Sequence, residues 1–282
     1  MPELPEVESI RRQLGSMIVG KTISSIEVFN PKSFKAEKKS LIGGKVVGVG
    51  RKGKVIIISL QGRALYVHLK MSGQLRFKVK EGTKKYLPAN VTHQVLQAGN
   101  KVQKGKSHLR VLFKFSSGDC LEFHDQRKFG WITDDSSVLP KGIDAMDPEL
   151  TADELEDVLQ SSNRPVKTIL LDQSKIAGIG NIYASEILWE AKISPFKKGR
   201  ALLQQQGLAL IKSIRKVLSE AIKFGGSTMD DGLYQHVGGE SGNYWSRRRV
   251  YDREGEPCLR CKTAIKKGVI GQRSTYWCPK CQ

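Results

Sequence analysis

The stretch Val55-Ile-Ile-Ile-Ser-Leu60, followed by Gln61-Gly62-Arg63 and Ala64-Leu-Tyr-Val-His-Leu69, decides the fold of the first third of the chain. β-Branched and aromatic residues fill both runs, and the short glycine-containing connection is typical of a hairpin. Val111-Leu-Phe-Lys-Phe115 and Cys120-Leu-Glu-Phe123 repeat this pattern around a second glycine-containing turn. Parallel strands would need helices between them, and none is visible, so we predict a mostly antiparallel β-sandwich.

A helical period replaces the strand pattern from about residue 149 onward. Thr151-Ala-Asp-Glu154 has the form of a capping box and predicts the start of a helix. The glycine-rich turn Lys175-Ile-Ala-Gly-Ile-Gly-Asn181 precedes a helix expected over residues 182–191. A third helix is amphipathic and ends at Gly225-Gly226. Its apolar positions are Leu210, Ile211, Ile214, Val217, Leu218, Ala221 and Ile222.

The length of 282 residues is enough for two domains and a small appendage. We predict an α+β protein: an antiparallel β-sandwich with an N-terminal helix, then a helical domain, then a small metal-bound hairpin. The expected boundaries are residues 1–140, 141–249 and 250–282, with a loop at residues 226–249. Residues 79–106 are weakly patterned and rich in lysine, glycine and glutamine, and are predicted to form an insertion between strands.

The last 25 residues contain Cys258-Leu-Arg-Cys261 and Cys278-Pro-Lys-Cys281, with sixteen residues between the pairs. This spacing is typical of tetrahedral zinc, because each tight turn supplies two thiolates. Four thiolates leave no coordination position for a substrate, so we predict one structural Zn²⁺. The alternative is two disulfides in a secreted protein. Zinc is favoured because no apolar signal segment precedes Pro2 and no run reaches the ~20 apolar residues of a membrane span. Cys120 is expected to be a core residue.

The charge balance is strongly basic. Lys and Arg number 47 against 28 acidic residues, which gives a formal net charge of +19 and an isoelectric point near 9.7. So large an excess favours a polyanionic partner, because basic side chains neutralise phosphates and release counterions. Charge alone is equally compatible with an RNA-binding protein.

The amino terminus, Met1-Pro-Glu-Leu-Pro-Glu-Val-Glu8, carries a candidate nucleophile. Removal of Met1 is expected because proline is small, and it would expose a secondary amine. An α-amino group titrates near ~8, so part of it is unprotonated at neutral pH and can form an iminium with a sugar carbon. Val7, Ile10 and Leu14 predict the buried stripe of the helix that follows.

Glu3 and Glu6 allow two interpretations. Acidic residues at a helix start complement the helix dipole, which is the structural explanation. Glu3 also stands next to the candidate nucleophile, where its carboxyl group could move protons on a sugar ring.

Six blocks of sequence resemble the formamidopyrimidine-DNA glycosylase family, in the same order along the chain. They are Pro2-Glu-Leu-Pro-Glu-Val-Glu8, Arg51-Lys-Gly-Lys54, His68-Leu-Lys-Met-Ser-Gly73, Asp125-Gln-Arg-Lys-Phe-Gly130, Lys175-Ile-Ala-Gly-Ile-Gly-Asn-Ile-Tyr183, and the zinc cysteines with Gly271-Gln-Arg273. The resemblance implies a monomeric, cytoplasmic, nucleoid-associated enzyme of bacterial type that acts on double-stranded DNA containing oxidised bases or abasic sites. It would excise oxidised purines and nick the backbone on both sides of the abasic sugar. The helical domain would be a helix–two-turn–helix domain, and residues 226–249 a lesion-capping loop.

The resemblance also implies the residues that carry the reaction. Pro2 would attack C1′ and form the Schiff base, and Glu3 would be the acid that assists ring opening. Lys54 would contact the phosphate beside the lesion, and Arg273 would grip flanking phosphates and serve the later elimination. The zinc would take no part in this chemistry.

Further positions match residues of the family that contact DNA. Met71, Arg127 and Phe129 would fill the space left when the damaged base is extruded, which is required because C1′ is unreachable inside a stacked duplex. The remaining predicted contacts are Glu6, His108, Arg164, Lys175 and Asn181. Backbone amides after Gly178 and Gly180 are expected to bind a backbone phosphate.

Two departures from the family pattern flank the predicted wedge. Lys70 stands where a glycine is usual, and Gln126-Arg-Lys128 replaces a proline–arginine–arginine run. Both keep the key side chains, so we expect an altered lesion preference. The lysines in and beside the insertion are expected to add non-specific DNA affinity. These are Lys78, Lys80, Lys84, Lys85, Lys101, Lys104 and Lys106.

Two alternative functions stay open on the sequence. An enzyme resembling endonuclease VIII would prefer oxidised pyrimidines, although Leu4 and the wedge residues favour purines. A non-catalytic DNA- or RNA-binding protein on the same scaffold would not need Pro2, Glu3 or Lys54, all of which are present.

Overall fold

The computed structural model describes residues 1–80, 108–229 and 232–282. The chain forms two compact units. The first unit consists of Met1–Pro2, Glu6–Leu139 and Gly225–Asn243, and the second of Glu3–Pro5, Pro140–Phe224 and Tyr244–Gln282. Among the described residues, no helix is both long enough and apolar enough to cross a membrane.

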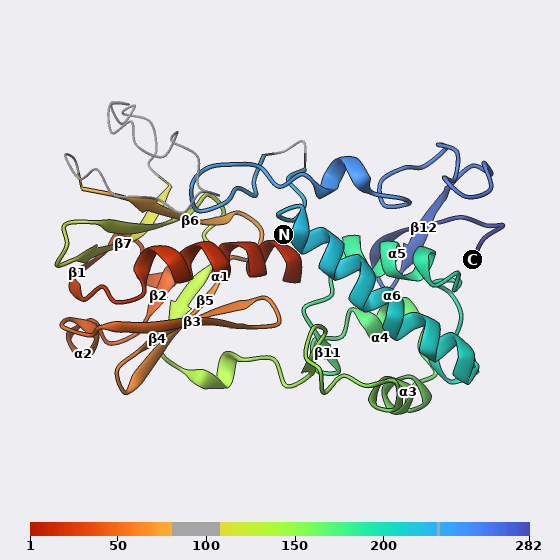
Figure 1. Cartoon of the computed structure of the whole chain (residues 1–282), viewed down its shortest axis with the longest axis horizontal. Coiled ribbons are helices and arrows are strands. Elements are labelled where there is room, and N and C mark those ends of the chain that lie inside the picture. Colours follow the sequence, from red (N-terminus) through yellow and green to blue (C-terminus); the bar gives the residue numbers. More distant parts are fainter. Residues whose placement is uncertain (81–107, 230–231) are drawn as a thin grey trace. The chain divides into compact units, whose positions relative to one another are not determined.

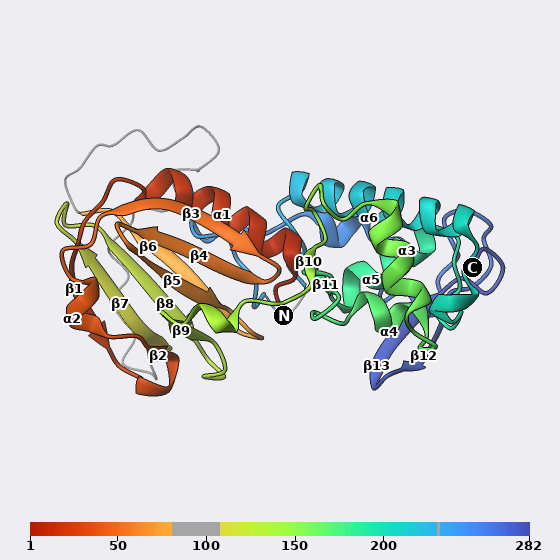
Figure 2. The same ribbon diagram turned by 90° about the horizontal axis from the view of Figure 1, so that it is seen from below.

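The first unit is a β-sandwich with helix α1 (Leu4–Ile18) packed against it (Figures 1 and 2). Within the described residues, one sheet has the order β1-β7-β8-β6 and the other β2-β9-β5-β4-β3. Among the described strand pairs of these two sheets, the short β2–β9 pair alone is parallel, so the predicted, mostly antiparallel sandwich is confirmed. The elements are β1 (Ile23–Val28), β2 (Phe34–Lys35), α2 (Lys38–Leu41), β3 (Val46–Lys52), β4 (Val55–Leu60), β5 (Arg63–His68), β6 (Gly73–Lys78), β7 (Leu109–Phe115), β8 (Cys120–Asp125) and β9 (Trp131–Thr133).

Local sequence signals account for the hairpin and the helix of this unit. Strands β4 and β5 pair from Val55 opposite His68 to Leu60 opposite Arg63, and Gly62 takes the positive φ of 75° that their tight turn requires. On α1, Val7, Ile10 and Leu14 are each at most 1% exposed and lie in a core built from both sheets, which confirms the predicted stripe.

Residues 225–243 pack with the first unit, whereas the sequence pattern assigns residues 226–249 to the helical domain. Tyr234 and Val237 join the sandwich core, at 6% and 2% exposure. The Tyr234 hydroxyl donates to the Gly225 carbonyl at 2.9 Å, and the Val237 N–H donates to Gln13 Oε1 at 2.9 Å. Two apolar side chains in a glycine-rich segment are too few to form a helical or strand periodicity. The sequence therefore gives no local indication of this packing. The domain boundaries themselves stay a prediction.

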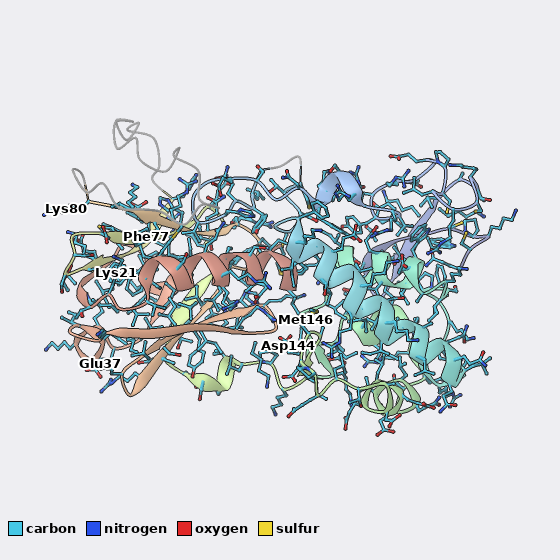
Figure 3. The ribbon with its side chains drawn as sticks, viewed as in Figure 1. Lys21, Glu37, Phe77, Lys80, Asp144 and Met146 are labelled. Atoms are coloured by element: carbon cyan, nitrogen blue, oxygen red, sulfur yellow. The ribbon has the colours of Figure 1, made fainter. Side chains whose placement is uncertain are left out.

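The second unit is helical and carries the C-terminal hairpin. Its elements are β10 (Ile143–Asp144), α3 (Ala152–Gln160), α4 (Val166–Leu170), β11 (Ile176–Ala177), α5 (Asn181–Glu190), α6 (Gln204–Lys223), β12 (Lys266–Ile270) and β13 (Arg273–Trp277). Thr151 Oγ1 accepts from the Glu154 N–H at 3.2 Å, which confirms the predicted start of α3. At the end of β10, the Asp144 side chain accepts from the Met146 N–H at 3.0 Å (Figure 3). Helices α5 and α6 lie where the sequence predicts them, and β12 and β13 form the expected hairpin.

Most of the predicted insertion, with Lys84, Lys85, Lys101, Lys104 and Lys106, lies outside the described residues. Of its two other lysines, Lys78 forms an ion pair with Glu122 at 2.7 Å, and the Lys80 N–H donates to Asp119 at 3.1 Å. Nearby, Lys21 pairs with Asp119 at 2.5 Å and lies 5.8 Å from the centre of the Phe77 ring (Figure 3). Carboxylates of the sandwich therefore already partner Lys21 and Lys78.

The expectation of a core position for Cys120 is wrong. Cys120 is the first residue of β8 and is only half-buried. The inward positions of this strand are taken by Leu121 and Phe123, because successive side chains of a strand point to opposite faces.

Candidate functional site

The candidate nucleophile Pro2 belongs to the first unit and is buried, whereas Met1 in front of it is 42% exposed. With Met1 in place, the Pro2 nitrogen is part of an amide and has no available lone pair. Release of Met1 would turn it into a secondary amine.

Glu3 belongs to the second unit, where its carboxylate caps helix α5. Oε1 accepts from the Ile182 N–H at 3.0 Å and Oε2 from the Tyr183 N–H at 3.3 Å. A Cβ atom at Gly180 would overlap this carboxylate, so a larger residue there would displace Glu3 from the amides. The helix N-terminus and its dipole thus hold a negative side chain of the protein itself, at 3% exposure.

This arrangement corrects one expectation. The sequence predicts that the amides freed by the glycine turn bind a DNA phosphate, but in the structure Glu3 accepts from the amides of Ile182 and Tyr183. No local pattern indicates this contact, because residues 3 and 182 are far apart in the sequence. Phosphate binding by the other amides of this turn stays a prediction.

Three side chains of the second unit lie near the tip of the β12–β13 hairpin, where Ile270 pairs with Arg273. Asn181, the first residue of α5, donates from Nδ2 to the Ser274 carbonyl at 3.0 Å. Lys167 on α4 donates from Nζ to the same carbonyl at 2.8 Å and to Thr275 Oγ1 at 2.9 Å. Arg273 opens β13 and is exposed. Two helices therefore fix the hairpin that presents Arg273.

Lys167 is a residue that the sequence reasoning missed. It is fully buried. Burial is the main effect, and it lowers the pKa of Lys167 to about 7. The Glu3 carboxylate raises this pKa, whereas the Arg273 charge lowers it further. The available signal is a lysine among the apolar residues Val166, Ile169 and Leu170 on one short helix.

Arg164 and Lys175 lie on the exposed surface of the second unit. Arg164 donates from Nη2 to Asp172 Oδ2 at 2.8 Å. Lys175 lies in the connection between α4 and α5, which Gln173 crosslinks by donating to the Leu171 and Ile179 carbonyls at 2.9 and 2.8 Å. Their contact with DNA stays a prediction.

In the first unit, a cluster of charges supports Lys54, which is 7% exposed and lies in the turn between β3 and β4. Arg51 donates from Nη1 to the Gly53 carbonyl at 2.9 Å and from Nε to Glu8 Oε2 at 3.2 Å. Glu8 also accepts from Arg11 and Arg12, each at 2.8 Å. Helix α1 therefore holds the Lys54 turn through one carboxylate.

Replacing Glu8 by Gln should destabilise the first unit in a pH-dependent way. Burial opposes the charged form, but the hydrogen bonds from Arg11 and Arg12 outweigh it and lower the pKa of Glu8 from 4.5 to about 2. A depressed folded-state pKa stabilises the protein above pH 4.5, and this stability is lost as the pH falls towards 2. The difference corresponds to about 3 kcal/mol, which solvent screening through the exposed Arg12 reduces to roughly 1–2 kcal/mol.

Urea unfolding of wild type and Glu8→Gln at pH 7 and pH 3 measures this effect. The difference in stability between the two proteins should be largest at pH 7 and clearly smaller at pH 3, because pH 3 lies between the unfolded pKa of 4.5 and the folded pKa of about 2. Glu27→Gln is the matched control, because Glu27 pairs with the exposed Lys114 on the same unit. An equal loss of stability at both pH values would contradict the role of the Glu8 charge.

The predicted wedge residues lie on two neighbouring loops of the first unit. Met71 and Phe129 are 37% and 57% exposed, and the Arg127 guanidinium lies 5.2 Å from the centre of the Phe129 ring. Asp125 ties the loops together. Its Oδ1 accepts from Ser72 Oγ at 2.5 Å and from the Arg127 N–H at 3.1 Å.

His108 and His68 lie beside these loops. His108 is exposed and its carbonyl accepts from the Asp125 N–H at 2.8 Å, so the backbone around it is anchored. His68 Nδ1 accepts from the Lys70 N–H at 2.9 Å. Burial, and then the charges of Lys70 and Lys54, lower the pKa of His68 to about 3, so this imidazole is neutral at pH 7.

One predicted DNA contact, Glu6, lies inside the protein. Glu6 is 2% exposed, and its Oε1 accepts from the Ser227 N–H at 2.7 Å, so it holds the 225–243 segment from inside the protein. Tyr244, in the predicted lesion-capping loop, is fully buried against Tyr183, with ring centres 5.5 Å apart. Trp245 beside it is half-buried.

The four C-terminal cysteines form a metal site. Their Sγ atoms all lie within 4.8 Å of one another, with Cys258–Cys281 at 3.9 Å and Cys261–Cys278 at 3.4 Å. Tetrahedral Zn²⁺ with Zn–S bonds of about 2.3 Å places sulfur atoms about 3.8 Å apart. A disulfide needs about 2.05 Å, and all five cysteines are free. The donor set fits one structural Zn²⁺ and not two disulfides.

Comparisons with known proteins agree along the whole chain. Residues 1–132 match the formamidopyrimidine-DNA glycosylase N-terminal domain, residues 141–232 the H2TH domain of the same enzymes, and residues 255–282 the zinc finger found in FPG and IleRS. The chain is 36% identical over 302 residues to formamidopyrimidine-DNA glycosylase of Mycobacterium avium, covering 100% of this chain and 98% of the relative.

Two solved structures are similar in fold. MutM (Fpg) of Thermus thermophilus has a TM-score of 0.83 at 32% identity, covering 100% of this chain and 98% of the other. The Lactococcus lactis FPG mutant G226P, in complex with DNA containing Fapy-dG, has a TM-score of 0.82 at 32% identity and coverages of 100% and 99%.

Proposed function

Because the chain belongs to the formamidopyrimidine-DNA glycosylase family, we propose that it excises oxidised purines, such as 8-oxoguanine and formamidopyrimidines, from duplex DNA and nicks the resulting abasic site. The Fapy-dG DNA bound by the Lactococcus lactis relative supports this substrate class. Zn²⁺ held by the four cysteines would fold the C-terminal hairpin and take no part in bond making.

The reaction begins at the free secondary amine of Pro2. Its nitrogen attacks C1′ of the damaged nucleotide and gives up its proton, while the N-glycosidic bond breaks and the base leaves with the electron pair. Ring opening, with a proton delivered to O4′, leaves an iminium between Pro2 and C1′. Loss of a C2′ proton expels the 3′ phosphate, a second elimination expels the 5′ phosphate, and hydrolysis returns Pro2.

The chain's own residues have distinct tasks in these steps. Glu3 is held by two amides in one orientation and exchanges the proton of the ring oxygen. Lys54 and Arg273 neutralise phosphates beside the lesion, and the exposed Met71, Arg127 and Phe129 occupy the space left by the extruded base. His108, Arg164, Lys175 and Asn181 would add contacts to the DNA backbone.

The observation that carries this proposal is the N-terminal Pro2-Glu3 pair, in which the carboxylate is fixed by the amides of Ile182 and Tyr183. Two duplexes test it, one with 8-oxoguanine opposite cytosine and one with thymine glycol. Base release and strand nicking on the first support the proposal. Activity on thymine glycol alone would select the endonuclease VIII-like alternative, and tight binding without cleavage of either would select a non-catalytic reader.

Replacing Lys70 by Gly is expected to weaken DNA binding in a salt-dependent way. Lys70 has a φ of 52°, which is unfavourable for a side chain, and it stands beside Met71 and close enough to His68 to affect its pKa. If its ammonium group neutralises one phosphate, the slope of log K against log salt should fall by about 0.9 in the variant. Fluorescence anisotropy with an abasic-analogue duplex measures the slope.

Lys192→Gly is the matched control for this experiment. Lys192 also has a positive φ, 57°, is exposed, and follows the end of α5 in the second unit, so the variant loses the same charge and the same backbone strain. The slope should stay at the wild-type value. Equal slopes for Lys70→Gly and wild type would show that Lys70 touches no phosphate.

The remaining assignments follow from the same function. The enzyme would act as a monomer in the bacterial cytoplasm, associated with the nucleoid, since its substrate is chromosomal DNA. The functional division would be residues 1–140, 141–249 and 250–282.

A further inference from the structure

The indole of Trp189 contacts the zinc site. Trp189 lies at the end of α5 and is 5% exposed, and its Nε1–H donates to Cys258 Sγ at 3.4 Å. Cys258 is itself fully buried, so water does not compete for this sulfur. The two residues share a small core with Val250, Ile265 and Tyr276.

Arg260, which lies between the two cysteines of the first pair, packs on the same indole. Its guanidinium carbon is 3.7 Å from the ring centre of Trp189. Nη1 donates to the Trp189 carbonyl at 2.7 Å and Nη2 to the Glu190 carbonyl at 3.2 Å, which satisfies acceptors at the C-terminal end of α5. The Arg260 guanidinium on one face and the Cys258 sulfur at the N–H edge thus fix the indole ring.

A hydrogen bond to a metal-bound thiolate withdraws electron density from sulfur. Groups around the direct ligands tune a metal site in this way. Oxidation by hydrogen peroxide requires the sulfur to attack an oxygen atom. The O–O bond breaks, hydroxide leaves, and the sulfur becomes a sulfenic acid, which no longer holds zinc as a thiolate does. A donor to the sulfur therefore slows this attack.

We propose that Trp189 is a positioning residue of the zinc site, whose indole N–H stabilises the Cys258 thiolate and protects the finger from oxidative loss of zinc. Other cysteine sulfurs of the site receive backbone donors, such as the Cys281 N–H to Cys278 Sγ at 3.4 Å. The Trp189 bond differs because a single side-chain exchange removes it and leaves the backbone intact.

The test compares the purified full chain with Trp189→Phe, which keeps an aromatic ring and lacks the donor. Trp277→Phe is the matched control, because Trp277 lies in the same finger and packs edge-on against Phe196, with ring centres 4.8 Å apart. Zinc release during peroxide treatment is followed with a chromogenic chelator. Trp189→Phe should release zinc about fivefold faster, which is the effect of losing one ordinary hydrogen bond, and Trp277→Phe at the wild-type rate.

Cobalt substitution gives a second readout that does not depend on oxidation. Without the donor, the thiolate-to-cobalt charge-transfer band should move to longer wavelength in Trp189→Phe and stay in place in Trp277→Phe. If Trp189→Phe does not fold, benzothienylalanine at position 189 keeps the ring shape and lacks the N–H. Unchanged release and an unchanged band, or equal changes in both variants, would overturn the proposal. No DNA is involved, so the outcome is independent of the proposed catalytic function.

Discussion

A chain that keeps a residue in front of Pro2 is expected to form no covalent intermediate with DNA. Inserting glutamine between Met1 and Pro2 should prevent methionine removal, because that removal requires a small second residue. The Pro2 nitrogen then stays in an amide, whose lone pair is delocalised, and cannot attack C1′. We expect a fall of roughly 10³-fold or more in base excision, as for the loss of a catalytic nucleophile.

Borohydride reduction of the iminium measures this directly, because it converts the Schiff base into a stable protein–DNA adduct. Wild type should trap on an 8-oxoguanine duplex, once mass spectrometry has confirmed the absence of Met1. The inserted chain should trap nothing and still bind an abasic-analogue duplex within about twofold, since the exposed Arg127 and Phe129 are unchanged. A full adduct yield from the chain that retains methionine would exclude Pro2 as the nucleophile.

Structural features that depend on residues close together in the sequence could be predicted in advance. The β4–β5 hairpin follows from two β-branched runs and one glycine turn, and the start of α3 from Thr151 and Glu154. The zinc site follows from the spacing of four cysteines, because a C-x-x-C turn places two sulfurs on one metal wherever the rest of the chain lies. In each case, neighbouring residues contain the whole signal.

Contacts between distant segments could not be predicted. Glu3 meets the amides of Ile182 and Tyr183, and Tyr234 enters the sandwich core, across separations that no periodicity records. Lys167 shows the same limit, because a buried lysine differs from a surface lysine only in the partners that fold around it. The orientation of Glu3 and Lys167, two groups of the candidate site, therefore depends on long-range contacts.

The glycine turn before α5 shows how a long-range contact can change which group a helix N-terminus binds. A helix N-terminus preceded by glycines does bind an anion here, as its exposed amides and dipole predict. At the amides of Ile182 and Tyr183 the acceptor is the Glu3 carboxylate, because residues 3–5 pack in the same unit as α5. The amides therefore orient the carboxylate that we propose to be catalytic, and exposed side chains such as Arg273 and Lys175 remain available for phosphates.

Removing zinc is expected to unfold the C-terminal hairpin and leave the first unit folded. The apolar cluster of the finger contains only a few side chains, several of them the cysteines themselves, and segments below about 40 residues seldom fold without a metal or disulfide. Zinc binding contributes about 10–16 kcal/mol in finger peptides, so its loss exceeds what that cluster can replace. Without the hairpin Arg273 is not presented, and the loss of its charge-assisted bonds should weaken DNA binding about 10- to 100-fold.

Cys281→Ser tests this prediction, with Cys120→Ser as the control because Cys120 lies half-buried on β8 in the other unit. Metal analysis measures the zinc content, limited trypsin digestion measures the folding of the hairpin, and fluorescence anisotropy measures DNA affinity. The zinc-poor variant should be cut at Lys266, Lys267 and Arg273, which the folded hairpin protects, while Cys120→Ser keeps its zinc and its affinity. A Cys281→Ser chain without zinc that resists trypsin there and binds DNA like wild type would mean that the hairpin folds on its contacts with Lys167 and Asn181 alone.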